Sequence, residues 1–156
     1  MRIGFGYDVH RLKAGRKCIL CGINIPGDFG PDGHSDADVP VHALIDALLG
    51  AAALGDIGRH FPDTETKWKD ADSINLLKAT VSLLKSNGYT LGNADITIVT
   101  EAPRLSSYIE KMRESIANAI GTGIGNISIK ATTEEKLGFT GDGSGLSATA
   151  VVLLVP

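Results

Sequence analysis

The chain has 156 residues, a length typical of one domain and sufficient to bury a substantial core. Hydrophobic residues make up 43% of it and aromatic residues only 5%, so we expect an aliphatic core, and the formal net charge of -3 argues against sequence-independent nucleic-acid binding. No stretch reaches the ~20 apolar residues that cross a bilayer, and the N-terminus lacks the organisation of a signal peptide, so we expect a soluble cytoplasmic protein without a membrane partner.

The first predicted element is a strand near the N-terminus. Apolar residues alternate there with glycine and polar residues: Ile3, Phe5, Tyr7 and Val9 against Gly4, Gly6, Asp8 and His10. A period of two is typical of a half-buried strand. One face of this strand is therefore apolar, and the other carries groups that can do chemistry.

A second strand is expected from Cys18 to Ile25, where Pro26 ends it. Because the chain has two cysteines, Cys18 and Cys21, and no second Cys pair, we expect both to be reduced and structural. The Gly-rich and Pro-rich stretch that leads to His34-Ser35-Asp36 predicts a loop.

Helices are predicted in three places. Residues 41–54 are apolar almost all round, which indicates a helix buried on several sides, with Pro40 in its first turn. Two amphipathic helices ending at Gly88 and Gly121 follow from the apolar stripes Ile74, Leu77, Val81 and Leu84, and Ile109, Met112, Ile116 and Ile120. Ser107 and Glu110 predict a capping box at the start of the last helix.

Further strands are predicted at residues 95–100, 127–132 and 146–155, so strands and helices are mixed along the chain. We therefore expect a single α+β domain over residues 1–156. The last segment has almost no polar face and needs cover on both sides, by helices or by neighbouring subunits. This pattern favours a homo-oligomer.

The strongest chemical signal is the pair Asp8 and His10. Residues two apart on a strand share a face and lie roughly 6 to 7 Å apart, so both side chains can reach one ion. Two such ligands, a third from elsewhere and an open fourth position are typical of catalytic zinc. His42 is the natural third ligand, with His34 and His60 as rivals. The alternative is that His10 and His42 only bond carbonyl groups or form surface ion pairs.

Residues 130–141 form a second region of interest, because a strand gives way there to a turn rich in hydroxyls and carboxylates. Such groups can hold phosphate oxygens or a hard divalent cation. The alternative is a helix cap, since Thr132 and Glu135 have the spacing of a capping box. Asp56 and Gly58 also have two possible roles. They could bind a sugar hydroxyl of a ligand, or they could only end the buried helix.

Ordered motifs along essentially the whole chain carry a resemblance to a known family. The motifs are Gly4-x-Gly6-Tyr7-Asp8-Val9-His10, His34-Ser35-Asp36-x-Asp38, His42-Ala43-Leu44-x-Asp46-Ala47-Leu48-Leu49-Gly50, Gly55-Asp56-Ile57-Gly58, Phe61-Pro62-Asp63, Ala102-Pro103 and Lys130-Ala131-Thr132-Thr133-x-Glu135-Lys136-Leu137-Gly138-Phe139. With them the chain resembles the 2-C-methyl-D-erythritol 2,4-cyclodiphosphate synthase family of non-mevalonate isoprenoid biosynthesis.

The resemblance implies a mixed β-sheet covered by helices on one face. It implies a homotrimer whose sheets face the three-fold interior and whose active sites lie between subunits. The implied enzyme is a lyase that converts 4-diphosphocytidyl-2-C-methyl-D-erythritol 2-phosphate into 2-C-methyl-D-erythritol 2,4-cyclodiphosphate and CMP. The 2-phosphate attacks the β-phosphorus of the same molecule, and two cations offset the repulsion between the phosphates.

The resemblance also implies roles for individual residues. One zinc per subunit is held by Asp8, His10 and His42, whereas Glu135 positions magnesium or manganese on the substrate diphosphate. His34 and Thr133 steady the reacting phosphates.

The implied substrate contacts form three groups. The erythritol-phosphate pocket is shaped by Ser35, Asp56, Gly58, Phe61 and Asp63. The cytidine pocket is formed by Thr100, Glu101, Ala102, Pro103, Arg104, Leu105, Ser106, Ala131 and Thr132, with Asp46 and Asp56 near the ribose or the pocket wall. The remaining contacts are Asp8, His10, His34, Ile57, Pro62, Thr64, Glu65, Thr133, Glu134, Glu135 and Phe139.

Three positions depart from the family's pattern. Glu134 stands where many relatives have Thr or Ser, which places a rival carboxylate beside Glu135. Asp142 stands where many have Arg, so no phosphate role is carried over to it, and the change argues against isoprenoid diphosphates in the trimer interior. Arg104 in place of Lys keeps the positive charge. A zinc-dependent phosphoesterase and a trimer in which zinc only orders a nucleotide pocket are the alternative classes.

Overall fold

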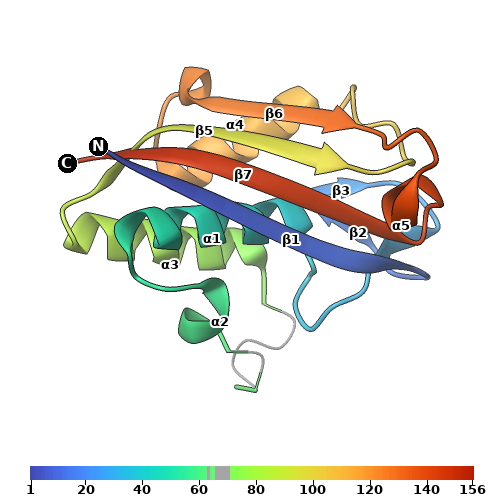
Figure 1. Ribbon diagram of the computed structural model, residues 1–156, viewed down its shortest axis with the longest axis horizontal. Helices are drawn as coiled ribbons and strands as arrows, with labels where there is room; N and C mark the ends of the chain where they lie inside the picture. Colours follow the sequence, from blue (N-terminus) through green and yellow to red (C-terminus); the bar gives the residue numbers. More distant parts are fainter. Residues whose placement is uncertain (63, 66–70) are drawn as a thin grey trace.

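The computed structural model describes residues 1–62, 64–65 and 71–156 (Figure 1). The elements are, in chain order, β1 (Arg2–Ala14), β2 (Cys18–Leu20), β3 (Ile23–Ile25), β4 (Phe29–Pro31), α1 (Val39–Ala52), α2 (Ile57–His60), α3 (Ser73–Ser86), β5 (Thr90–Val99), α4 (Ile109–Ile120), the 3-10 helix η2 (Ile124–Asn126), β6 (Ile127–Thr132), α5 (Gly138–Gly141) and β7 (Gly145–Val155). Strands and helices are mixed along the chain, so the α+β prediction is confirmed.

One mixed sheet organises the fold. Its strand order is β4-β1-β7-β5-β6, in which β5 and β6 run parallel and the other neighbours run antiparallel. β2 and β3 pair separately as an antiparallel hairpin. Helix α1 packs on β1 and β7, α4 packs on β6, and α3 lies against both helices (Figure 1). The helices therefore cover one face of the sheet, as the resemblance implied.

Helix α1 packs with its backbone directly on β1. A Cβ atom added at Gly4 would lie 1.9 Å from the carbonyl oxygen of Ala47, and one added at Gly6 would lie 2.0 Å from that of Ala43. A larger side chain at either strand position would push the helix away. The two glycines therefore set the short distance between the helix and the strand.

The opposite side of β1 is apolar and exposed. Ile3 is 76% exposed and Phe5 is 65% exposed. The same surface continues onto β7, where Val151 pairs with Phe5 and is 45% exposed. A half-buried strand usually buries its apolar face. In β1 the face with Gly4 and Gly6 is buried instead, because only residues without a side chain leave room for the backbone of α1.

Strand β7 has the two apolar faces that its sequence predicted. One face points into the core and is buried, with the side chains of Leu146, Ala148, Ala150, Val152 and Leu154. The alternate residues from Thr149 to Val155 are half-buried or exposed. A single chain therefore leaves part of this apolar strand in contact with water.

The predicted continuous strand from Cys18 to Ile25 is wrong, because this segment is a hairpin. Cys21 and Gly22 have φ angles of 53° and 76°, which are typical of the turns that join tight hairpins and cannot belong to a strand. Both cysteines are free and buried, as predicted. The predicted loop that follows contains a short strand, β4, which pairs with the end of β1.

Several later boundaries follow the sequence signals, but β5 begins at Thr90 instead of at the predicted residue 95. Pro40 lies in the first turn of α1, Gly121 ends α4 with a φ of 78°, and β6 spans the predicted residues. The capping box predicted from Ser107 and Glu110 is wrong, because Tyr108 is the N-cap of α4 and makes no side-chain capping hydrogen bond. Among the described residues, none of the helices has the length and apolar character that crossing a bilayer requires.

Candidate active site

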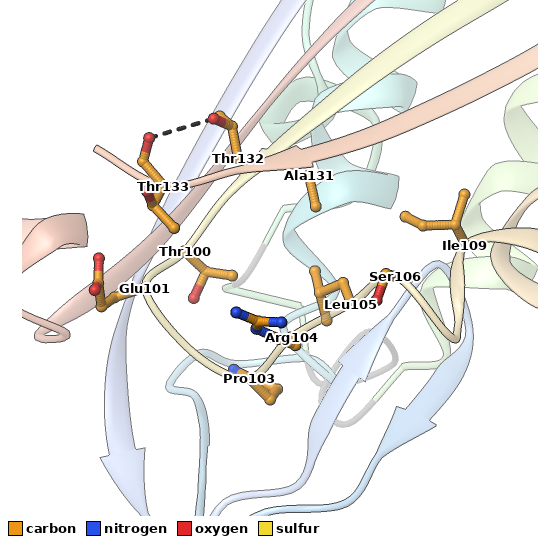
Figure 2. A pocket seen from close by; sticks show the side chains of 10 residues that line it. All are labelled: Thr100, Glu101, Pro103, Arg104, Leu105, Ser106, Ile109, Ala131, Thr132 and Thr133. Atoms are coloured by element: carbon orange, nitrogen blue, oxygen red, sulfur yellow. Dashed lines mark hydrogen bonds between the residues drawn. The ribbon is translucent and has the colours of Figure 1, made fainter. Parts of the chain in front are cut away.

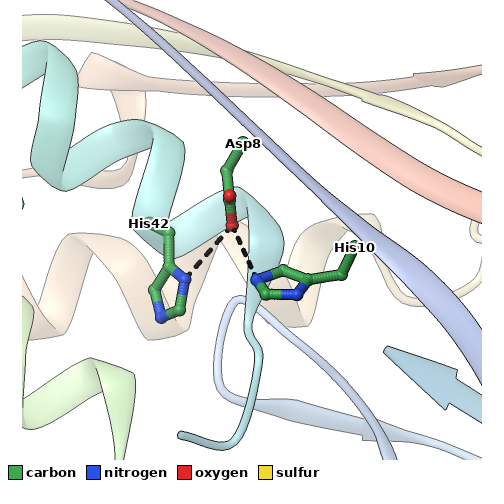
Figure 3. Close-up of side chains that lie close together, drawn as sticks. All are labelled: Asp8, His10 and His42. Carbon is green, nitrogen blue, oxygen red and sulfur yellow. Dashed lines mark hydrogen bonds and ion pairs between the residues drawn. The ribbon is translucent and has the colours of Figure 1, made fainter. Parts of the chain in front are cut away.

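Three predicted metal ligands lie together between β1 and the first turn of α1. Asp8 and His10 project from the same face of β1, and His42 comes from α1 (Figure 3). The Oδ2 atom of Asp8 lies 3.1 Å from Nδ1 of His42 and 3.4 Å from Nε2 of His10. One ligand atom of each residue lies within 4.8 Å of the ligand atoms of the other two.

This spacing fits a bound metal ion. Ligand atoms at about 2.0 to 2.1 Å from a tetrahedral zinc lie about 3.3 Å from one another, which is close to both distances measured from Asp8. One carboxylate oxygen and two imidazole nitrogens leave a fourth tetrahedral position for another ligand. The cluster is therefore a candidate metal site, in which His42 is the third ligand that spacing alone left open.

The outer ring nitrogens of both histidines are hydrogen-bonded away from this centre. Nδ1 of His10 lies 2.7 Å from the carbonyl oxygen of Asp32, and Nε2 of His42 lies 2.9 Å from Oγ of Ser73. Such outer bonds determine which nitrogen carries the proton and which faces a metal. Sequence reasoning missed both partners, because a backbone carbonyl and a serine at the start of a helix carry no recognisable pattern.

The pKa values of Asp8 and His10 depend on the contacts within the cluster. Burial alone would raise the pKa of Asp8, but the hydrogen bonds and charges of His10 and His42 outweigh it and hold that pKa well below its usual range. The hydrogen bond to Asp8 raises the pKa of His10, against the opposing effect of burial. Asp8 is therefore ionised at neutral pH and presents a negative charge to a cation.

A pocket of about 310 Å³ opens beside the cluster. Two of the predicted metal ligands and several predicted substrate contacts line this pocket. The lining residues are His10, His34, Ser35, His42, Ile57, Gly58, Phe61 and Leu76. Leu76 is the member that sequence reasoning missed. Of the two rival ligands, His34 lies exposed on the pocket wall, whereas Nε2 of His60 bonds the carbonyl oxygen of Leu54 at 2.9 Å.

Two predicted substrate contacts cap backbone groups within the chain. Oδ1 of Asp46 accepts a hydrogen bond from the backbone N–H of Ile57 at 2.8 Å, and Oδ1 of Asp56 accepts one from that of Arg59 at 2.9 Å. Both carboxylates thereby fix the start of α2, which forms part of the pocket wall. Beyond α2, the predicted contacts Pro62, Thr64 and Glu65 are described, and Asp63 lies outside the described residues.

A second pocket, of about 370 Å³, lies at the ends of β5 and β6 (Figure 2). Most of the predicted nucleotide contacts line it, namely Thr100, Glu101, Pro103, Arg104, Leu105, Ser106, Ala131 and Thr132, together with Thr133, which was predicted to steady the reacting phosphates. Ile109 also lines the pocket and was missed. Ala102 is absent from the lining, but its carbonyl oxygen accepts a hydrogen bond from Oγ1 of Thr100 at 2.7 Å, which holds the turn.

The loop between β6 and α5 holds the remaining predicted phosphate and cation residues. Oγ1 of Thr133 donates to Oε1 of Glu135 at 2.9 Å, whereas Oγ1 of Thr140 donates to Oε2 of Glu134. The neighbouring carboxylates are thus directed to different partners. The helix-cap alternative for Thr132 and Glu135 is wrong, because α5 begins later in the chain and has no side-chain cap.

The two pockets occupy separate places on one chain. Within the described parts of the chain, no residue lines both of them. The pocket beside the metal cluster is lined by residues of β1, α1 and α2, and the other is lined by residues at the ends of β5 and β6. Figure 1 shows where these elements lie. Phe139, predicted as a substrate contact, is 45% exposed on α5 and lines neither pocket. Residues expected in one active site therefore form two groups.

Comparisons with known proteins cover the whole chain. The YgbB family matches residues 1–155. A 2-C-methyl-D-erythritol 2,4-cyclodiphosphate synthase from Trichlorobacter lovleyi is 56% identical over 156 residues, which is 100% of this chain and 99% of the relative. A 2C-methyl-D-erythritol-2,4-cyclodiphosphate synthase solved in a CDP-bound form has a TM-score of 0.91 and 38% identity, over 99% of this chain and 100% of that one. The bifunctional IspDF from Campylobacter jejuni has a TM-score of 0.95 and 40% identity over 98% of this chain, which spans 42% of that protein.

Proposed function

The chain belongs to the YgbB family, and from this premise we propose that it converts 4-diphosphocytidyl-2-C-methyl-D-erythritol 2-phosphate into 2-C-methyl-D-erythritol 2,4-cyclodiphosphate and CMP. It is then a phosphorus-oxygen lyase of non-mevalonate isoprenoid biosynthesis, with one catalytic domain over residues 1–156. The observation that carries the proposal is the cluster of Asp8, His10 and His42 beside a pocket, in a chain 56% identical to a named synthase.

We propose zinc as the ion of this cluster, held by Asp8, His10 and His42. One carboxylate and two imidazoles with an open fourth position suit catalytic zinc. When bound, zinc supplies a Lewis acid toward a phosphate oxygen. The chain's own contribution is to fix the ligands: the carbonyl of Asp32 and the hydroxyl of Ser73 orient the two rings before any ion arrives.

The reaction requires two phosphates of one substrate to meet despite their repulsion. We propose that the pocket beside the cluster binds the erythritol-phosphate end, and that His34 and Thr133 steady the reacting phosphates. An oxygen of the 2-phosphate forms the new bond to the β-phosphorus, while the bond from that phosphorus to CMP breaks and CMP leaves. Because nucleophile and electrophile belong to one bound molecule, good alignment contributes about 7 to 11 kcal/mol toward the barrier.

The pocket at β5 and β6 is proposed to bind the cytidine diphosphate end. A related synthase was solved in a CDP-bound form, and Arg104 brings a positive charge to this pocket of the chain, which supports the proposal. We propose that Glu135 positions magnesium or manganese on the diphosphate, because carboxylate oxygens suit hard divalent cations. The hydroxyl of Thr133 orients this carboxylate.

We further propose a cytoplasmic homotrimer in which each active site lies between subunits. The separation of the two pockets on one chain supports a site completed by a neighbour. The exposed apolar side chains of Ile3, Phe5 and Val151 support burial of this sheet face around a three-fold axis. The helices then lie on the outside of the assembly.

Product analysis tests the proposed reaction. Incubated with the diphosphocytidyl substrate, zinc and magnesium, the protein should release CMP and the cyclic diphosphate in equal amounts. A zinc-dependent phosphoesterase would give linear products, and a nucleotide-binding trimer would give no product. Either result would overturn the proposal.

A further inference from the structure

A chain of polar side chains leads from the metal cluster to the start of α3. Nε2 of His42 lies 2.9 Å from Oγ of Ser73, and that hydroxyl in turn donates to Oδ1 of Asp36. The other carboxylate oxygen of Asp36 accepts the backbone N–H of Ser73 at 2.9 Å. His42 is therefore connected through one hydroxyl to a carboxylate outside the cluster.

The direction of these hydrogen bonds follows from the number of protons available. A serine hydroxyl has one proton, and an ionised carboxylate can only accept. Because the proton of Ser73 goes to Asp36, the oxygen of Ser73 must accept from His42, so Nε2 of His42 carries a proton. Nδ1 of His42 is hydrogen-bonded to Oδ2 of Asp8 at 3.1 Å. When Nδ1 gives up its proton to a metal ion, it presents the lone pair that a metal ligand requires, while Nε2 keeps its proton.

Both positioning groups are held firmly by the fold. Ser73 is fully buried as the first residue of α3, so its hydroxyl cannot turn to water. Asp36 also accepts the backbone N–H of Asp38 at 3.2 Å, and its own N–H donates to the carbonyl of Ala71 at 3.3 Å. The loop before α1 is thereby joined to the start of α3. Oγ of Ser35 also approaches Nε2 of His42, at the longer distance of 3.3 Å.

We propose that Ser73 and Asp36 are positioning residues that fix the tautomer and ring orientation of His42, so that Nδ1 is the metal-binding atom. This inference rests on the metal site of the proposed function. A hydrogen-bonded partner on the outer nitrogen of a ligating histidine typically changes metal affinity by about 10- to 100-fold when it is removed. His10 is held in the corresponding way by a backbone carbonyl, which no side-chain substitution removes.

Zinc affinity of the full-length protein, measured by competition with a chelator, tests the proposal. Ser73→Ala should weaken zinc binding by about 10- to 100-fold. Asp36→Asn should weaken it in the same direction, because one acceptor for Ser73 is lost, and it serves as the second variant if Ser73→Ala does not fold. Nitrogen-15 NMR of the zinc-loaded wild type should show the proton of His42 on Nε2.

Asp72→Ala is the matched control. Oδ1 of Asp72 accepts the backbone N–H of Ile74 at 2.8 Å and caps the same helix, but it has no contact with His42 among those described. This variant should lose stability and keep wild-type zinc affinity. Equal zinc loss in Asp72→Ala and Ser73→Ala, wild-type affinity in Ser73→Ala, or a proton on Nδ1 would each overturn the proposal. If the wild-type protein binds zinc but forms no cyclic product, the proposed reaction is contradicted, whereas the inference about Ser73 and Asp36 is unaffected.

Discussion

The metal cluster and the loop after β6 carry the two ends of the proposed site, and the chain holds them in different ways. In the cluster, Asp8 and His42 are largely buried, and the outer nitrogen of each histidine is bonded to another part of the fold. In the loop, Thr133 and Glu135 are exposed, and the hydrogen bond of Glu135 that positions its carboxylate comes from its neighbour Thr133.

This difference shows which half of the site one chain can organise. Buried hydrogen bonds hold a geometry because breaking them leaves polar groups without partners, whereas exposed ones exchange with water at little cost. The metal half is therefore organised within a single chain. The phosphate half needs a cation, a substrate or a neighbouring subunit to define its geometry, and the following experiments separate the two halves.

Removing a metal ligand should have the largest effect. In His42→Ala the cluster loses an imidazole, so bound zinc and turnover should disappear together. His60→Ala is the matched control, because that imidazole bonds the carbonyl of Leu54 instead. Elemental analysis and the product assay give both quantities. Retained zinc with full turnover in His42→Ala would remove this residue from the ligand set.

Filling the space between β1 and α1 should damage the cluster without touching a ligand. In Gly6→Ala the new methyl group meets the carbonyl oxygen of Ala43, so α1 must move and carry His42 with it. Overpacking of this kind costs about 1 to 3 kcal/mol of stability. Gly123→Ala, where an added Cβ atom meets nothing within 4 Å, is the control. Thermal unfolding and zinc stoichiometry should both fall in Gly6→Ala, and unchanged values would contradict the close-packing argument.

A charge on the exposed sheet face should separate assembly from metal binding. Phe5→Asp places a carboxylate in the face proposed to line the trimer, so the variant should run as a smaller particle in gel filtration. It should keep its zinc, because the cluster lies on the other face of β1, and lose most turnover. Ile124→Asp, on η2, is the control. Full turnover by a monomeric Phe5→Asp would show that one chain contains the whole site.

The exposed half of the site should respond to a smaller change. Glu135→Gln removes the charge proposed to hold the second cation, so it should keep zinc and lose most of the magnesium-dependent rate. Glu134→Gln is the comparison, because Glu134 bonds Thr140 and should affect α5 instead. Initial rates against magnesium concentration distinguish the two. If only Glu134→Gln loses the dependence of the rate on magnesium, then Glu134, and not Glu135, holds the second cation.

The smallest expected effect is that of pH on the zinc-free protein. The pKa of His10 lies above its ordinary value of 6.5, so its contribution to stability is present below about 6.5 and is lost as pH rises through the folded value. The pKa of Asp8 lies below its ordinary value of 3.8, so its contribution is present above about 3.8 and is lost on acidification. The cluster should therefore stabilise the zinc-free fold most between these values.

Zinc binding should have a different pH dependence, because zinc competes with the proton of His10. The rise in melting temperature on adding zinc should grow from about pH 6 to about pH 8. Thermal unfolding with and without zinc measures this rise. A rise that is constant over the range would contradict the protonation of His10 in the zinc-free protein.

Local patterns were sufficient for much of this protein. The alternation around Asp8 and His10 predicted one strand with both side chains on one face, and the structure confirms it. The stripe of Ile109 to Ile120 with Gly121 predicted α4 and its end, although the predicted cap at Ser107 was wrong. These features depend on neighbours in the sequence, because strand and helix periods act over a few residues.

Contacts between distant segments were decided only by the tertiary structure. Periodicity shows which residues share a face of β1, but it cannot show that the glycine face is the one that α1 covers. Spacing alone could not choose His42 over His34 and His60, or connect it to Ser73, because these contacts depend on how α1, β1 and α3 pack. The sequence by itself determined the strand that presents two ligands, and its family motifs indicated His42 as the third. Packing of separate elements brought His42 to the other two ligands and determined the orientation of its ring.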